Sequence, residues 1–266
     1  MEIPLGICAP APMPAIPFTR IAELVFPEQT NHHGTLFGGA SLALMDRAGY
    51  IAATRFTRRR MVTAAINDVA FGKPVLPGQL AELSAHIVKT GRNSCDVMCE
   101  LVAEDLLTGD RQSAVSGRMV MASIGEAEAP MPPPSAVASP PPDDNLTRFV
   151  EVVFPDTSNH RDILFGGEAL SMMGKAAFIA ATRHCRMTVV MAASEEVEFR
   201  CPVKVGEFAI LTARILMTGK SSIRVGVDLD VEDPMTGDVR SSAVGRFTMV
   251  ALDDKGRPAQ VPPRLD

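Results

Sequence analysis

One short pattern of residues occurs twice in the sequence and could carry chemistry at a carbonyl group. The segment NHHGTLFGG at 31–39 returns with changes as NHRDILFGG at 159–167. Each glycine pair opens a run of about helix length, so it would leave backbone N–H groups at the positive end of a buried helix. Such groups stabilise a developing oxyanion. The alternative is that the glycines only let a helix and a strand approach closely.

An aspartate in the first of these runs could supply the base for the same chemistry. Asp46 lies among apolar residues, where burial of its charge would be costly and would make the carboxylate a stronger base. The second copy has Gly174 at the equivalent position. A purely structural aspartate would be expected in both copies, so the asymmetry favours function over a carboxylate that only bonds to a neighbouring loop.

The elements that must position these residues follow from an internal duplication. Residues 26–122 align without a gap with the residues 128 positions later, and IAATR at 51–55, for example, returns at 179–183. A period this long indicates two copies of a domain, because solenoid repeats are about 20 to 50 residues long.

Each copy shows the same order of predicted elements. The runs 40–55 and 168–183 have the length and the Ala, Leu and Met content of a buried helix. Residues 223–231 then alternate between apolar and charged side chains, which predicts a strand. A hairpin at the repeated TGD leads to a further strand that carries Gly245, Arg246 and Met249. We therefore expect an α+β fold in which an antiparallel sheet wraps around each helix and the copies pair as an intrachain pseudo-dimer.

Proline-rich segments suggest where the copies begin and end. We predict an irregular arm at 1–19, a first domain at 20–125, a linker at 126–146 and a second domain at 147–266. The arm is apolar, but it has no basic residue before Arg20 and its prolines would break a helix, so we do not interpret it as a signal peptide.

Composition narrows the class of protein. The chain has 266 residues and a formal net charge of -5, which argues against a nucleic-acid partner. Its 5 cysteines contain no CxxC pair and fit neither a disulfide framework nor a zinc cluster, so a reducing cytoplasm is the simplest location. No stretch reaches the roughly 18 apolar residues of a membrane span.

These features together resemble one family, the tandem hotdog-fold acyl-CoA thioesterases of the cytosolic acyl-CoA hydrolase type. The resemblance covers residues 26–261 and rests on the order of several short motifs. They are the N-x-x-G-x-x-F-G-G loop (Asn31, Gly34, Phe37, Gly38, Gly39), Asp46, a Val-Thr strand (Val62, Thr63), F-x-x-P-V-x-x-G (Phe71, Pro74, Val75, Gly78) and a G-x-x-S turn (Gly91, Ser94). The resemblance implies hydrolysis of fatty acyl-CoA to a free acid and CoA, without a metal or other cofactor, by a chain that often joins three pseudo-dimers into one homo-oligomer.

Helix geometry predicts which halves of the pattern work together. Asp46 lies seven residues beyond Gly39, or about 10 Å along the same helix, which is too far to act on a carbonyl at its own helix start. The partner must be the start of the other helix, at Gly166 and Gly167.

We therefore predict one composite site with Asp46 opposite Asn159, and a dead or regulatory pocket with Asn31 opposite Gly174. The resemblance implies that Asp46 is a general base or a nucleophile and that Asn159 orients water or the carbonyl. Asp162, which replaces Gly34, and Glu168 are weaker candidate carboxylates, since a residue at a helix start is usually a cap.

Further residues have both a functional and a structural interpretation. Thr63, which becomes Met191 in the second copy, could hold the attacking water or simply pack in a strand. Arg92 and Lys220 could bind CoA phosphates or be solvated turn residues, and the same alternatives apply to the arginines at 58–60. The histidine pair at 32–33 has no third ligand nearby, so we predict no metal.

Two other functions were weighed against thioester hydrolysis. A duplicated hotdog could bind acyl-CoA without turnover, as the degenerate second copy suggests. A hydratase is less favoured, because His32 and His160 lie in the loops without the usual motif of that family.

Overall fold

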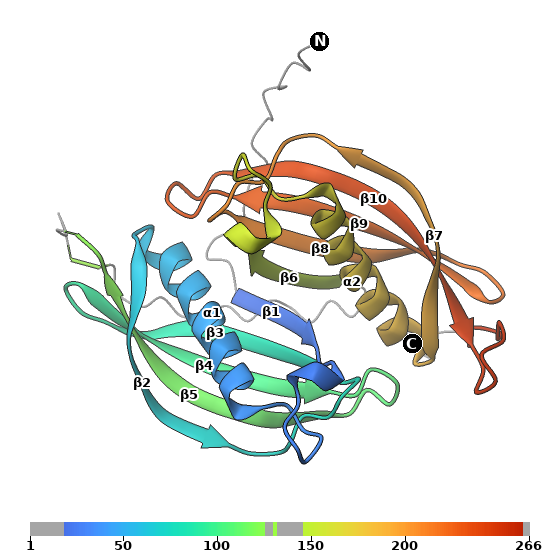
Figure 1. Cartoon of the computed structure of the whole chain (residues 1–266), viewed down its shortest axis with the longest axis horizontal. Coiled ribbons are helices and arrows are strands. Elements are labelled where there is room, and N and C mark those ends of the chain that lie inside the picture. Colours follow the sequence, from blue (N-terminus) through green and yellow to red (C-terminus); the bar gives the residue numbers. More distant parts are fainter. Residues whose placement is uncertain (1–18, 126–129, 132–145, 263–266) are drawn as a thin grey trace, which may run out of the picture.

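The structure is a computed structural model that describes residues 19–125, 130–131 and 146–262. Residues 1–18 of the predicted arm and most of the predicted linker lie outside the described residues, while Thr19 already belongs to the first strand. Two units of the same design follow one another, each with one long helix and five strands (Figure 1). Unit 1 comprises β1 (Thr19–Leu24), η1 (Pro27–Gln29), α1 (Gly38–Thr57), β2 (Met61–Phe71), β3 (Leu80–Thr90), β4 (Ser94–Glu104) and β5 (Arg111–Ser123). Unit 2 comprises β6 (Leu146–Val152), η2 (Pro155–Thr157), α2 (Gly166–Cys185), β7 (Thr188–Phe199), β8 (Phe208–Thr218), β9 (Ser222–Glu232) and β10 (Val239–Leu252).

The two helices confirm the predicted runs and extend them by two residues at each end. Both begin at the glycine pair and end at an arginine with φ of 53°, Arg58 or Arg186. This left-handed residue turns its amide back to a threonine carbonyl four residues earlier and stops the helix. Alanine and large apolar side chains bury much of each helix against its own sheet, which makes the helix the centre of its unit.

Each sheet is antiparallel, with the order β1-β3-β4-β5-β2 in unit 1 and β6-β8-β9-β10-β7 in unit 2. The alternation predicted for β9 is confirmed, because Ile223, Val225, Val227, Leu229 and Val231 are all fully buried. The TGD segments form the turns before β5 and β10, where Gly109 and Gly237 have φ near 80°. The strand that follows each helix pairs at the far edge of its sheet, beside the last strand, so only β3-β4-β5 and β8-β9-β10 form simple meanders.

The two units meet along β1 and β6, which are the inner edge strands of their sheets (Figure 1). Among the described strands no backbone pairing joins the two sheets. The contact is made by side chains instead. Phe208 of unit 2 lies in the core of unit 1 and packs edge-on against Tyr50, with ring centres 6.1 Å apart. Leu80 of unit 1 lies in the core of unit 2. The units therefore share their cores, as a pseudo-dimer requires.

Ion pairs hold the end of each helix to the opposite sheet. Arg55 at the end of α1 pairs with Glu232 of β9 at 2.5 Å, and the two side chains are only 4% and 0% exposed. Arg183 at the end of α2 pairs with Glu104 of β4 at 2.5 Å and with Glu82 of β3 at 2.9 Å. Each helix is thus tied at its C-terminal end to the sheet of the other unit. Neither of them is long and apolar enough to cross a membrane, within the residues that the structure describes.

Candidate functional site

The starts of the two helices differ in what occupies the space above them. A Cβ on Gly39 would lie 2.5 Å from the ring of Phe37, so packing alone explains that glycine. A Cβ on Gly167 would meet nothing within 4 Å, so close packing does not explain this one. The residue before each helix, Phe37 or Phe165, provides no side-chain cap, so this feature is shared. The start of α2 is therefore the more open of the two to a ligand.

The two asparagines hold their loops in the same way but differ in their amide nitrogens. Oδ1 of Asn31 accepts from the amides of His33 and Thr35, and Oδ1 of Asn159 accepts from the amides of Arg161 and Ile163. The two loops therefore share these bonds although Asp162 replaces Gly34; both residues have positive φ, at 55° and 71°.

The nitrogens distinguish the two loops. Nδ2 of Asn31 donates to the Thr35 hydroxyl at 3.0 Å. The residue equivalent to Thr35 in unit 2 is Ile163, which has no hydroxyl. Nδ2 of Asn159 accordingly has no hydrogen-bond partner in the described part of the chain. Within the described residues both N–H groups of Asn159 are thus uncommitted, whereas one of the two N–H groups of Asn31 is bound to Thr35.

Asp46 and Thr63 are brought together as a pair. Asp46 lies in the middle of α1 and is half-buried, while Thr63 lies on β2 and is exposed. The Thr63 hydroxyl donates to Oδ1 of Asp46 and also lies 3.7 Å from the sulfur of Met121. A carboxylate held by a hydroxyl at the surface of a helix is an arrangement that can accept a proton from a bound water.

The equivalent positions in unit 2 contain no such pair. Gly174 is buried in α2, and a Cβ placed on it would lie 3.0 Å from the terminal methyl of Met191. Met191 replaces Thr63, so its side chain reaches the place where a carboxylate at position 174 would begin. The loss of the aspartate and the loss of the threonine are therefore one coupled change.

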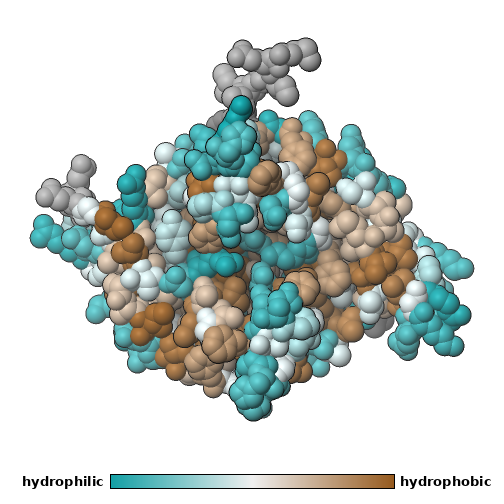
Figure 2. Space-filling view, in the orientation of Figure 1, coloured by the Kyte–Doolittle hydropathy of each residue, from teal (hydrophilic) through white to brown (hydrophobic). Residues whose placement is uncertain are grey.

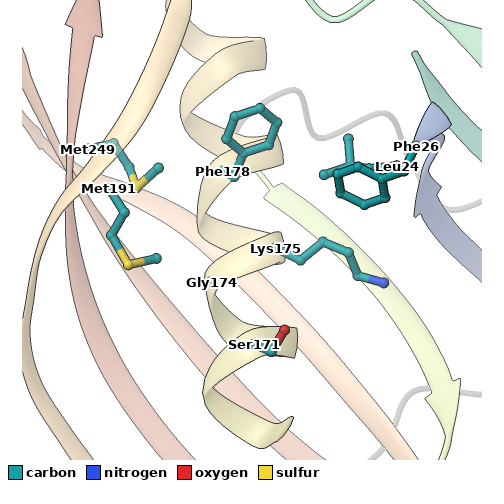
Figure 3. A pocket seen from close by; sticks show the side chains of 8 residues that line it. All are labelled: Leu24, Phe26, Ser171, Gly174, Lys175, Phe178, Met191 and Met249. Atoms are coloured by element: carbon teal, nitrogen blue, oxygen red, sulfur yellow. The ribbon is translucent and has the colours of Figure 1, made fainter. Parts of the chain in front are cut away.

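Contacts across the boundary show which loop faces which helix. The guanidinium carbon of Arg47, next to Asp46, lies 5.6 Å from the centre of the Phe154 ring. Phe154 leads through η2 to Asn159. At the other end of the boundary, Leu24 and Phe26, which lead through η1 to Asn31, line a hollow together with Gly174 (Figure 3). The segments that lead to the two loops, at Phe154 and Phe26, thus lie against the helix of the other unit.

The electrostatics of the two helix centres also differ. Lys175, the counterpart of Arg47, lies 2.5 Å from Glu151 and 3.2 Å from Glu23. Burial opposes the charge on this lysine, but the two carboxylates outweigh it and raise the pKa of Lys175. Behind Asp46, burial and then the aspartate charge raise the pKa of Cys99 to about 12.

No hydrogen bond or ion pair within the described residues joins Asp46 to Asn159, Arg92 or Lys220. Arg92 and Lys220 are exposed on the turns between β3 and β4 and between β8 and β9. Arg58 takes part in the contact between the units, because its guanidinium pairs with the buried Glu232 at 2.7 Å. The rings of His32 and His33 lie against one another at 3.9 Å, and the described residues contain no group of three or more His, Cys, Asp or Glu side chains able to hold a metal.

Sequence reasoning missed a hollow of about 270 Å³ at the start of α2. Its lining includes Gly166, Phe199, Arg200 and Ser242. Arg200 places a cation there and pairs with Glu198 at 3.1 Å. Two sequence signals were available in the alignment of the copies, the departure of Arg200 from its counterpart Gly72 and the replacement of Thr35 by Ile163.

The sequence and the structure of the chain are both similar to those of known proteins. The model of the Thioesterase superfamily matches residues 33–109 and again residues 162–237. An acyl-CoA hydrolase structure from Agrobacterium tumefaciens is 41% identical, with a TM-score of 0.84, and the match covers 92% of this chain and 98% of that one.

Two curated relatives match over nearly the whole chain. Human cytosolic acyl coenzyme A thioester hydrolase is 22% identical over 97% of this chain and 82% of its own length. Mouse acyl-coenzyme A thioesterase 11 is 25% identical over 91% of this chain, which spans only 48% of that relative.

Proposed function

The chain belongs to the thioesterase superfamily, a family of thioester hydrolases, and we propose that it cleaves fatty acyl-CoA to a free acid and CoA. We propose one composite active site, with Asp46 supplied by unit 1 and Asn159 by unit 2. The names of the relatives support the acyl-CoA thioester as the substrate class. The two halves of the chain supply different parts of the site.

One observation carries the proposal, namely that two independent asymmetries and one contact across the boundary favour the same pair of loop and helix. Among the described residues the Asp46–Thr63 pair exists on α1 and β2 and has no counterpart in unit 2. Nδ2 of Asn159 makes no hydrogen bond within the described residues, whereas Nδ2 of Asn31 donates to Thr35. The contact of Arg47 with Phe154 brings the Asn159 loop toward the turn of α1 that carries Asp46. A base, a water-holding hydroxyl and a carbonyl donor are the groups that hydrolysis needs.

The reaction then follows from the roles of these groups. Nδ2 of Asn159 and the amides of Gly166 and Gly167 polarise the thioester carbonyl, with the positive end of α2 behind them. Asp46 takes a proton from a water that Thr63 orients, and the water oxygen bonds to the carbonyl carbon. When the C–S bond breaks, Asp46 returns the proton to the CoA sulfur. Direct attack by Asp46 is the alternative, and it would place one ¹⁸O from labelled water in the aspartate during turnover.

The test is release of CoA from saturated acyl-CoAs of increasing chain length, followed with a thiol reagent. We expect turnover that depends on chain length. A chain that binds these thioesters but releases no CoA from any of them would be a binding protein instead.

Arg92 and Lys220 are our proposed contacts for the CoA phosphates, supported by their exposed positions on turns. Replacing either with Glu should raise KM for acyl-CoA and leave kcat nearly unchanged, since the phosphates do not react. An equal effect on turnover of a simple thioester without CoA would assign the loss to the fold.

We also propose that three pseudo-dimers associate, in a reducing cytoplasm. The outer edge strands β2 and β7 expose apolar side chains such as Ile66, Phe71 and Phe199, and Figure 2 shows apolar surface on both flanks of the molecule. Exposed apolar edges favour association. The four described cysteines form no disulfide. Light scattering that gives the mass of one chain would contradict the assembly.

A further inference from the structure

At the second junction between the units, Leu24 and Phe26 of unit 1 face the part of α2 that carries Gly174. A hollow of about 320 Å³ lies there, and no proposed step of the reaction uses it (Figure 3). Two of its lining residues, Leu24 and Phe26, belong to unit 1, and the others belong to unit 2: Ser171, Gly174, Lys175, Phe178, Met191 and Met249. Its volume is at the lower end of the roughly 300–1,000 Å³ of small-molecule sites. The hollow is therefore large enough for part of a ligand.

This hollow is the counterpart of the proposed active site under the duplication. Phe26 corresponds to Phe154, and Gly174 corresponds to Asp46. The Asn31 loop keeps the bonds from Oδ1 that shape the Asn159 loop. The hollow thus retains a space in which an acyl-CoA could lie, but it lacks the aspartate and the threonine that would cleave the thioester.

The walls of the hollow suit an alkyl chain. In Figure 3, Phe178 and Lys175 extend from α2 toward Leu24 and Phe26, and the two methionines lie on the other side of Gly174. Because Gly174 has no side chain, nothing from α2 separates these two walls at that point. Methionines adapt to irregular apolar ligands. A chain could therefore lie across the helix here.

The charges at the rim discriminate between the neutral thioester and the free acid. Lys175 is the one cation that lines the hollow, and it already pairs with Glu23 and Glu151. This trio carries a net negative charge, which repels the carboxylate of a fatty acid. An acyl chain attached as a thioester has no charge at that end.

We propose that this hollow binds the acyl chain of an acyl-CoA and does not hydrolyse it. The inference rests on the proposed function, because the ligand is identified from the equivalent active site. Without a carboxylate at 174 or a hydroxyl at 191, no group there can activate water, so the thioester stays intact.

The first test counts bound ligands with a thioether analogue of acyl-CoA, in which a methylene prevents hydrolysis. Equilibrium titration of the full chain should give two analogues per chain. Ser171→Phe fills the hollow from an exposed position and should reduce the count to one, while Ser171→Ala should keep two. A count of one for the wild type, or of two for Ser171→Phe, would overturn the proposal.

The second test rebuilds the missing groups. Asp46→Asn combined with Gly174→Asp and Met191→Thr should release CoA at least ten times faster than Asp46→Asn alone. The methionine must change together with the glycine, because its methyl would lie 3.0 Å from the new Cβ. A folded triple variant without this gain would overturn the proposal, and if the variant unfolds, the binding count decides. Failure of the wild type to release CoA refutes the proposed function but leaves the count unaffected.

Discussion

The two junctions between units 1 and 2 have the same backbone design and different chemistry. At one, Asp46 and Thr63 form a hydrogen-bonded pair and the Asn159 amide is uncommitted. At the other, Met191 reaches toward Gly174 and the Asn31 amide is bound to Thr35. In our proposal the duplication kept two places for a ligand, and three differences in side chains, at Asp46/Gly174, Thr63/Met191 and Thr35/Ile163, concentrate the chemistry in one of them. The structural and catalytic requirements of the family can thus separate within a single chain.

The largest effect should come from removing the base. Asp46→Asn keeps the size of the side chain and loses the proton acceptor, so kcat should fall by about 10²–10⁴-fold with little change in stability. The matched control is Asp68→Asn, the same substitution at an exposed carboxylate that pairs with Arg118. If kcat falls equally in the two variants, Asp46 is not the proton acceptor of the reaction.

Loss of a carboxylate should lower the free energy of unfolding more at the end of α1 than at the end of α2. Glu232→Gln leaves the buried Arg55 without its carboxylate and should lower the free energy of unfolding by about 3–5 kcal/mol. Glu104→Gln should cost less, because Arg183 keeps its contact with Glu82. Urea titrations of both variants measure this difference, and a larger loss for Glu104→Gln would contradict it.

Removal of the threonine hydroxyl should have a smaller effect on rate. Thr63→Val loses the bond to Asp46 and should lower kcat about tenfold, as expected for one hydrogen bond to a charged group, while KM changes little. Thr248→Val is the control, because its hydroxyl donates to Glu195 at 2.6 Å, outside the proposed active site. The interpretation fails if both variants retain wild-type kcat.

The smallest effect concerns the thiol behind Asp46. With the pKa of Cys99 near 12, only about one thiol in ten thousand is ionised at pH 8, so alkylation of the native chain should bypass it. The same holds for Cys95, whose pKa burial and Asp96 raise to about 11. Mass spectrometry after alkylation would identify the labelled cysteines. Rapid labelling of Cys99 would show that the core behind Asp46 opens.

The sequence predicted the helices and the duplicated sheet, because each follows from periodicity or glycine placement, while the crossed pairing of Asp46 with Asn159 stays a prediction from the length of a helix. It did not predict the ion pairs of Arg55 and Arg183, since Glu232 and Glu104 are far away in the chain and look like ordinary strand-end charges. The role of Ile163 was also missed. Ile163 matters because its counterpart Thr35 accepts a hydrogen bond from Asn31, and only the structure shows that bond.

The central claim is that the active site uses the asparagine of unit 2 with the aspartate of unit 1. The most direct measurement is kcat for Asn159→Asp and Asn31→Asp, because each substitution keeps the Oδ1 acceptor that holds the loop and removes the N–H donor. Asn159→Asp should lose about 10²–10³-fold, as for removal of an oxyanion donor, and Asn31→Asp should stay within a few fold of wild type. Loss of turnover in Asn31→Asp with full activity in Asn159→Asp would contradict the composite site.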